Sequence, residues 1–164
     1  MTIQAGVITV SDKGSQGTRE DKSGPEIVKI LEGIGAVVRH RAIIPDEIDQ
    51  ITKTLIDFAD HKRVDLIVTT GGTGVAPRDV TPDATLTVID KEIPGMAEAM
   101  RYESSKITPH AMISRAIVGI RGRSLIINLP GSPKGAKENL AVILPALKHA
   151  IEKIKGDEAD CASS

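Results

Sequence analysis

The sequence has almost no aromatic residues. Its 164 residues include one Phe, one Tyr and no Trp, whereas hydrophobic residues make up 40%, so the core has to be aliphatic. Proteins that bind single-stranded nucleic acids stack bases on aromatic side chains. Aromatic cages and the aromatic belts of membrane proteins need the same residues. We therefore expect neither nucleic acid nor membrane as a partner.

Cysteine and excess charge are also scarce. Cys161 is the only cysteine, so no internal disulfide can form, which is typical of a reducing compartment. The 21 basic and 22 acidic residues nearly cancel, which argues against a basic DNA-binding surface. No apolar run approaches the roughly 18 residues of a membrane span, and no signal peptide precedes the first strand-like run. These absences predict a cytoplasmic protein.

Segments typical of strands and of helices alternate along the chain. Short β-branched runs predict strands at residues 5–10, 37–44 and 64–69. Apolar residues at helical spacing predict helices at 25–34, from 45 to about 59, at 81–89, 96–105 and 136–155. Two more β-like runs, 116–120 and 124–129, form either a hairpin or two separate strands.

This alternation predicts one α/β domain over residues 1–155, with a mostly parallel sheet covered by helices on both faces. Phe58 falls within a predicted helix beside its apolar residues, so we expect it in the core. The polar residues 156–164 are expected to form a disordered tail.

Four polar segments follow predicted strands. They lie at residues 11–12, 45–46, 70–79 and 128–134. Because ligands of open α/β sheets bind outside the carboxyl ends of the strands, we expect these segments to converge on one site.

The segment at 69–74 reads Thr-Thr-Gly-Gly-Thr-Gly. Three glycines in four residues let the backbone turn tightly, and exposed N–H groups in such a loop can bind phosphate. A plain strand-to-helix turn is the alternative. The loop is neither a Walker A motif nor the dinucleotide-binding pattern, because Pro77 stands where the latter needs its third Gly.

Two carboxylates accompany this loop. Asp79 follows Gly74 after four intervening residues, and Asp46 follows the strand at 37–44. A carboxylate beside bound phosphate needs a bridging cation, and Mg²⁺ binds one or two carboxylates together with phosphate oxygens. The alternative for Asp46 is an ordinary helix N-cap.

The segment at 128–135 holds two prolines and two glycines before the last helix. Lys134 in this segment faces either an anion or solvent. The four histidines are far apart, so the sequence predicts no zinc site and no Cys–His nucleophile pair. Acyl-transfer hydrolysis is set aside because no Gly-x-Ser-x-Gly motif occurs.

The glycine loop, Asp79 and the sequence Val-Thr-Pro-Asp-Ala-Thr at 80–85 together resemble the signature of molybdenum-cofactor biosynthesis proteins. The resemblance is strongest to the MogA/MoaB type, the molybdopterin adenylyltransferase group. Supporting segments at 11–12, 45–47, 94–95 and 129–134 extend it over about residues 5–155.

This resemblance implies a three-layer α/β/α fold and a homotrimer, with a hexamer as the alternative. It implies transfer of AMP from Mg-ATP to molybdopterin, with release of pyrophosphate, and hand-over of the product to a molybdate-inserting protein. A non-catalytic molybdopterin-binding scaffold of the same fold is the second hypothesis, and an anion-binding domain of another pathway is the third.

The resemblance also assigns residues. Asp46 and Asp79 take the positions of the acidic residues needed for catalysis, and they are the candidate Mg²⁺ ligands. The candidate nucleotide- and substrate-binding residues are Ser11, Asp12, Thr70, Gly71, Gly72, Thr73, Gly74, Arg78, Pro130, Gly131, Ser132 and Lys134. Which basic residues grip the pterin stays open among Lys13, Arg19, Arg78, Lys134 and Lys137. With so few aromatics, the adenine is expected to rest on aliphatic side chains and glycine backbone.

Overall fold

A computed structural model describes residues 1–156 and contains one six-stranded sheet in the order β2-β1-β3-β6-β5-β4. The pairings among β1, β2, β3 and β6 are parallel, whereas β5 and β4 run antiparallel at one edge. The strands are β1 (Gln4–Val10), β2 (Val37–Ile44), β3 (Leu66–Thr70), β4 (Lys91–Glu92), β5 (Val118–Arg121) and β6 (Ser124–Leu129).

The parallel part of the sheet therefore consists of four strands joined by three pairings: β2 with β1, β1 with β3, and β3 with β6. β5 and β6 form a hairpin, so the first of the two alternatives for residues 116–129 is confirmed. Gly122 makes the turn with φ +55°, a conformation that glycine adopts without a Cβ penalty.

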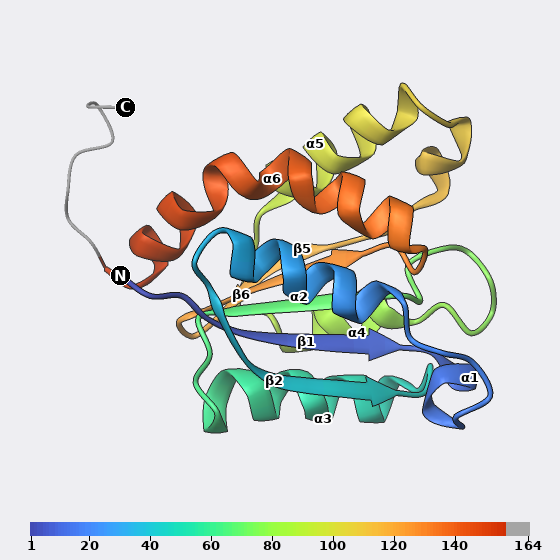
Figure 1. Cartoon of the computed structure of the whole chain (residues 1–164), viewed down its shortest axis with the longest axis horizontal. Helices are drawn as coiled ribbons and strands as arrows, with labels where there is room; N and C mark the ends of the chain where they lie inside the picture. The colour runs from blue at the N-terminus through green and yellow to red at the C-terminus, as the bar shows by residue number, and fades with distance from the viewer. Residues whose placement is uncertain (157–164) are drawn as a thin grey trace.

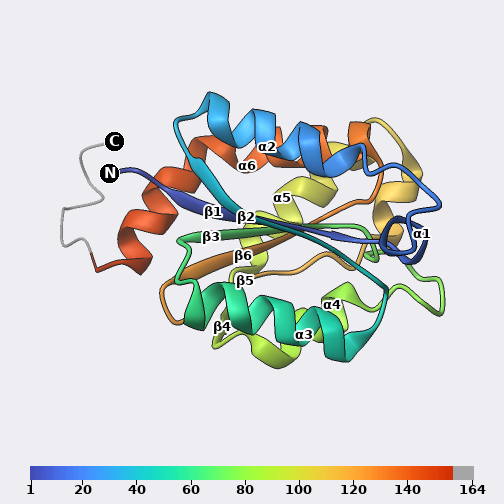
Figure 2. The same ribbon diagram turned by 60° about the horizontal axis from the view of Figure 1, so that its bottom comes forward.

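Helices cover both faces of this sheet, so the α/β prediction is confirmed (Figures 1 and 2). One face carries α2 (Ser23–Gly33), α5 (Pro94–Ser105) and α6 (Pro133–Ile154). The other carries α3 (Ile48–Ile56), the π-helix η1 (Asp57–His61) and α4 (Thr81–Val88). Two short helices complete the described residues: α1 (Asp12–Ser15) and the 3-10 helix η2 (Pro109–Ile113).

Each face has its own aliphatic core because successive residues of a buried strand point to opposite faces. On β6, Ile127 belongs to the α2–α5–α6 core, and Ile126 belongs to the α3–α4 core. Phe58 is 2% exposed in the second core, as predicted. Its ring lies where a side chain on Gly6 of β1 would have to go.

Two local predictions were wrong. No helix was predicted between the strand at 5–10 and the helix at 25–34, but Asp12–Ser15 form the single turn of α1, which the Ser11 side chain caps by accepting from Gly14 N at 3.0 Å. The next helix was predicted from residue 45, with Asp46 as a candidate N-cap. Instead α3 begins at Ile48 after Glu47, because the Asp46 side chain accepts from α1.

No helix among residues 1–156 is long and apolar enough to span a membrane. The predicted tail at 156–164 lies outside the described residues except for Gly156, which follows α6 in a turn. The carboxyl ends of β2, β1, β3 and β6 all meet at the edge near α1, on the right in Figure 1.

Candidate functional site

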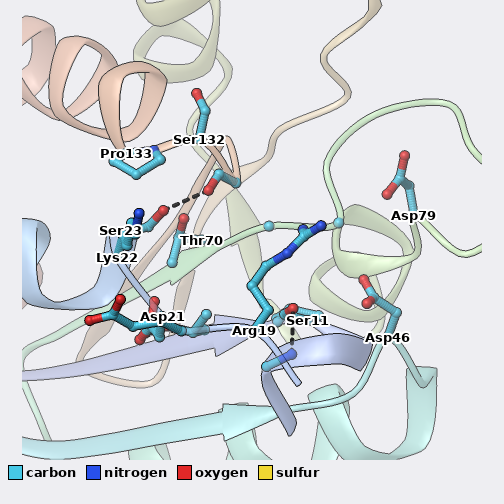
Figure 3. Close-up of a pocket in the computed structure, with 17 residues that line it drawn as sticks. Ser11, Arg19, Asp21, Lys22, Ser23, Asp46, Thr70, Asp79, Ser132 and Pro133 are labelled. Carbon is cyan, nitrogen blue, oxygen red and sulfur yellow. Dashed lines mark hydrogen bonds between the residues drawn. The ribbon is translucent and has the colours of Figure 1, made fainter. Parts of the chain in front are cut away.

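An open cavity of about 770 Å³ lies at this edge (Figure 3). Its walls come from the loops that follow β1, β2, β3 and β6, so the predicted convergence of the four segments is confirmed. The cavity is within the size range of small-ligand sites. Its lining contains no aromatic side chain and consists of Thr9, Val10, Ser11, Gly14, Arg19, Glu20, Asp21, Lys22, Ser23, Asp46, Thr70, Gly71, Gly72, Asp79, Gly131, Ser132 and Pro133.

The glycine loop forms the floor of this cavity. Gly71 and Gly72 have φ +102° and +66°, a region that residues with a Cβ rarely adopt. A Cβ on Gly71 would collide with Val10 O, and one on Gly72 would collide with Thr81 Oγ1 and approach Asp46 Oδ1 to 3.0 Å. The chain therefore needs glycine here both for its backbone conformation and for space.

Hydrogen bonds hold this loop against its neighbours. Thr81 Oγ1 donates to Gly71 O at 2.9 Å, and Thr81 N donates to Gly72 O at 3.1 Å. Thr70 Oγ1 donates to Pro130 O at 2.7 Å, which joins the end of β3 to the end of β6. The loop is thus fixed before any ligand arrives.

The loop after β6 lies beside the glycine loop and also lines the cavity. Ser23, at the start of α2, donates from Oγ to Gly131 O at 2.6 Å. Ser132 caps α6 by accepting from Gly135 N at 3.0 Å. The N-terminal ends of α2 and α6 therefore both border the cavity, and helix N-termini favour anions.

Asp46 and Asp79 line the same cavity, on the side opposite Lys22, Ser23 and Pro133 in Figure 3. Asp46 exchanges two hydrogen bonds with Asp12: Asp12 N donates to Asp46 Oδ2 at 2.9 Å, and Asp46 N donates to Asp12 Oδ1 at 3.0 Å. Partial burial raises the pKa of Asp46, and the charges of Asp12 and Asp79 raise it further. A cation between the carboxylates would offset this repulsion.

Asp12 and Arg78, both predicted to bind substrate, lie outside the cavity lining and contact each other instead. Arg78 Nε and Nη2 donate to Asp12 at 2.6 and 2.9 Å, and Nη2 also donates to Glu47 at 2.8 Å. These hydrogen bonds lower the pKa of Asp12. The pair ties the loop after β3 to α1 and to the start of α3.

Four other predicted binding residues also lie outside this lining. Thr73, Gly74 and Pro130 line a second cavity of about 280 Å³ beside α5, η2 and α6. Lys134 is 79% exposed and lies 3.9 Å from Glu138 on the same helix. Thr70, Gly71 and Gly72 therefore line the first cavity, whereas Thr73 and Gly74 line the second.

Several lining residues were not singled out from the sequence, and they come from the segment between β1 and α2. Asp21 accepts from Thr9 Oγ1 and from Gly24 N, both at 2.9 Å, and so fixes the start of α2. The side chains of Arg19 and Lys22 border the cavity and have no polar partner among residues 1–156. Of the five candidate basic residues, only Arg19 lines this cavity. The sequence signal that could have identified these residues is the position of their segment after β1, at the carboxyl end of that strand.

The two carboxylates suit a metal ion that is bound jointly by the protein and the substrate phosphates, not one that the protein holds alone. No group of three or more metal-binding side chains occurs among residues 1–156. Asp46 uses Oδ2 for Asp12 N, while its Oδ1 faces Gly72. Two carboxylates with open oxygens beside a glycine loop fit Mg²⁺, which keeps waters and substrate phosphates in its coordination shell.

Comparison with known proteins identifies the family. Residues 6–149 match the family model described as "Probable molybdopterin binding domain". The chain belongs to the molybdenum-cofactor biosynthesis family. It is 46% identical over 158 residues to the molybdopterin adenylyltransferase of Helicobacter pylori strain J99, covering 95% of this chain and 90% of that one.

Other members of the family are similar over most of their length. The molybdopterin adenylyltransferase of Escherichia coli K12 is 43% identical over 141 residues, covering 85% of this chain and 72% of that one. The crystal structure of the molybdopterin biosynthesis enzyme MoaB from Thermus thermophilus superposes with a TM-score of 0.90 at 47% identity, covering 95% and 98% of the two chains. The cavity therefore lies in a fold that solved members of the family share.

Proposed function

We propose that this chain is a molybdopterin adenylyltransferase, which transfers AMP from ATP to the terminal phosphate of molybdopterin and releases pyrophosphate. The adenylyltransferases of the family support this enzyme class at 43–46% identity over most of the chain. The observation that carries it is the cavity in which the glycine loop, Asp46 and Asp79 meet at one sheet edge.

The reaction needs positioning and charge neutralisation more than a nucleophilic side chain. An oxygen of the molybdopterin phosphate, already ionised at neutral pH, attacks the α-phosphorus of ATP. The new P–O bond forms as the bond between the α-phosphorus and its bridging oxygen breaks, and pyrophosphate leaves. The absence of histidine from the cavity lining agrees with such a reaction.

The cavity lining provides contacts for the phosphates of ATP and molybdopterin. Arg19, Lys22 and the N-terminal ends of α2 and α6 would attract the anions, and the glycine loop lets phosphates approach its backbone. Asp46 and Asp79 would hold Mg²⁺, which neutralises phosphate charge when bound. We assign nucleotide or molybdopterin binding to Ser11, Thr70, Gly71, Gly72, Gly131 and Ser132, which line this cavity.

The oligomeric state, the location and the partner of the protein are also inferred. We infer a single molybdopterin-binding domain over residues 1–155 that works in the cytoplasm as a homotrimer, with a hexamer as the alternative. Adenylylated molybdopterin would pass to a molybdate-inserting protein. Size-exclusion chromatography with light scattering tests the oligomeric state.

Pyrophosphate release tests the activity. The purified protein, molybdopterin and Mg-ATP should yield one pyrophosphate for each molybdopterin consumed, and omission of molybdopterin should abolish the release. Calorimetry separates a binding-only scaffold from the enzyme, because the enzyme must bind Mg-ATP saturably. Molybdopterin binding without ATP binding would contradict the proposal in favour of the scaffold.

A further inference from the structure

Arg115 lies between η2 and β5, and its contacts converge on the loop that carries Asp79. Its backbone N donates to Thr73 O at 2.8 Å. Its guanidinium donates from Nε to Gly74 O at 2.9 Å and from Nη2 to Asp79 O at 2.5 Å. Arg115 therefore joins the two ends of the segment 74–79, which lie 41 and 36 residues away along the chain.

A carboxylate fixes the guanidinium in turn. Nη1 and Nη2 of Arg115 donate to Asp83 Oδ1 and Oδ2 at 3.1 and 3.0 Å. Asp83 lies in the first turn of α4, and its pKa is lowered by these hydrogen bonds. Such two-point contacts define the plane of the guanidinium as well as its position.

Arg78 is the other side chain that anchors this segment, through Asp12 and Glu47, but its contacts lie on the outer side of the loop and not at Gly74 or Asp79. Residues 75–78 are exposed, and Val75 is 63% exposed. Asp79 closes this segment on itself, since Ala76 N donates to Asp79 Oδ2 and Asp79 N donates to Ala76 O, both at 2.9 Å. The position of the Asp79 carboxylate in the cavity therefore depends on where the base of this turn is held.

Arg115 does not reach the cavity itself. It is absent from the cavity lining, and its guanidinium already makes four hydrogen bonds within the protein. An arginine has five N–H donors, so little capacity is left for a ligand.

We propose that Arg115 is a positioning residue, which sets the place of the Asp79 carboxylate by holding the carbonyls of Gly74 and Asp79. The role in turnover rests on the proposed adenylyl transfer. A lysine carries the same charge but cannot hold two carbonyls and a carboxylate in one plane. The guanidinium shape, rather than its charge, is what the loop requires.

The kinetic test compares Arg115→Lys and Arg115→Gln with Arg121→Lys. Arg121 is a matched control, because it also pairs with a carboxylate, Asp60, through two nitrogens and donates to a carbonyl, Val88 O, outside the cavity. Both Arg115 variants should lower kcat for pyrophosphate release about 10- to 100-fold, the usual effect of a displaced catalytic group, with a smaller change in KM for ATP. Arg121→Lys should leave kcat unchanged.

Hydrogen exchange gives a second readout that does not depend on activity. Amides of residues 73–80 should exchange faster in Arg115→Gln than in the wild type, and Arg121→Lys should leave them unchanged. Asp83→Asn serves if the Arg115 variants fail to fold, and it should accelerate exchange in the same residues.

Three outcomes would overturn the role of Arg115: unchanged exchange at 73–80, wild-type kcat in folded Arg115→Lys, or an equal loss of kcat in Arg121→Lys. An inactive wild type contradicts the proposed function instead, and the exchange experiment then still decides whether Arg115 holds the loop.

Discussion

The two carboxylates of the cavity differ in what surrounds them. Asp46 is bonded to α1 through Asp12, whereas Asp79 is bonded within its own turn through Ala76. Asparagine can accept the same hydrogen bonds from backbone N–H groups but carries no charge. Substitution by asparagine therefore separates the charge of each residue from its structural contacts.

Asp79→Asn should lower the rate of pyrophosphate release by about 100-fold or more, as removal of one charge-stabilising group does in other enzymes. The far-ultraviolet circular dichroism and the melting temperature should stay close to those of the wild type. Asp90→Asn is the control, because Asp90 also accepts from a backbone N–H, that of Gly122 at 2.7 Å, outside the cavity. A fully active Asp79→Asn would remove Asp79 from the mechanism.

Asp12 and Asp46 should respond to pH with opposite signs. The pKa of Asp12 is lowered by Arg78, so its charge stabilises the fold above the ordinary Asp pKa of about 4, and this contribution is lost as the pH falls through the lowered pKa. The pKa of Asp46 is raised, mainly by burial, so its contribution is present at acid pH and is lost as the pH rises through the raised pKa.

In EDTA at pH 7, Asp12→Asn should therefore lower the melting temperature and Asp46→Asn should raise it. Both differences should shrink when the melts are repeated at about pH 3, which is below the ordinary Asp pKa of about 4 that applies in the unfolded chain. Thermal unfolding followed by circular dichroism measures both. A lower melting temperature for Asp46→Asn at pH 7 would contradict the expected sign and show that the charge of Asp46 stabilises the fold.

At the scale of elements, the β3–α4 connection determines the shape of the cavity floor. Gly72→Ala should destabilise the protein more than Gly35→Ala, although both glycines have positive φ, +66° and +83°. Gly35 has open space around its Cβ position, so alanine there costs about 1–2 kcal/mol of backbone strain. Gly72→Ala adds collision with Thr81 and should also reduce pyrophosphate release. Urea unfolding of both variants tests this, and equal losses would contradict it.

The elements that could be predicted from sequence are those with a local signal. The β-branched run at 37–44 matches β2 residue for residue, and the buried run at 64–69 matches β3 within two residues at its start. The two-residue β4 and the five-residue η2 carry no such periodicity, and they were missed. The helix predicted to about residue 59 covers the start of η1 but did not indicate that this part is a π-helix. Local sequence patterns therefore predicted the helix and sheet layers of the fold and the sheet edge at which the cavity lies.

The contacts that were not predictable join distant parts of the chain. Asp46 resembles an N-cap locally, but its partner Asp12 lies 34 residues away. Arg115 has no recognisable motif, because its partners are backbone carbonyls and Asp83. The convergence of the four segments needed only the strand order and is confirmed. The direction of single side chains was not predictable, and Asp12 and Lys134 lie outside the lining.

At the scale of the whole molecule, one sheet contributes residues to two hydrophobic cores, one on each of its faces. Ile126 and Ile127 are both fully buried on β6 but face opposite layers. Ile126→Ala and Ile127→Ala should each lower the free energy of unfolding by about 2–5 kcal/mol. Because β6 is common to both layers, each variant should still unfold in one cooperative transition. Urea titration followed by circular dichroism measures this, and two separate transitions would show that the layers unfold independently.

The placement of the two aromatic rings has a practical consequence for observing this protein. Phe58 is enclosed in the α3–α4 core, and Tyr102 on α5 is 66% exposed and lines neither cavity. With no Trp in the chain, near-ultraviolet absorption by the polypeptide is weak. Optical signals from a bound pterin or adenine can then be recorded directly, without interference from neighbouring protein chromophores. Folding, in contrast, has to be followed through the backbone, because the protein has no intrinsic tryptophan fluorescence.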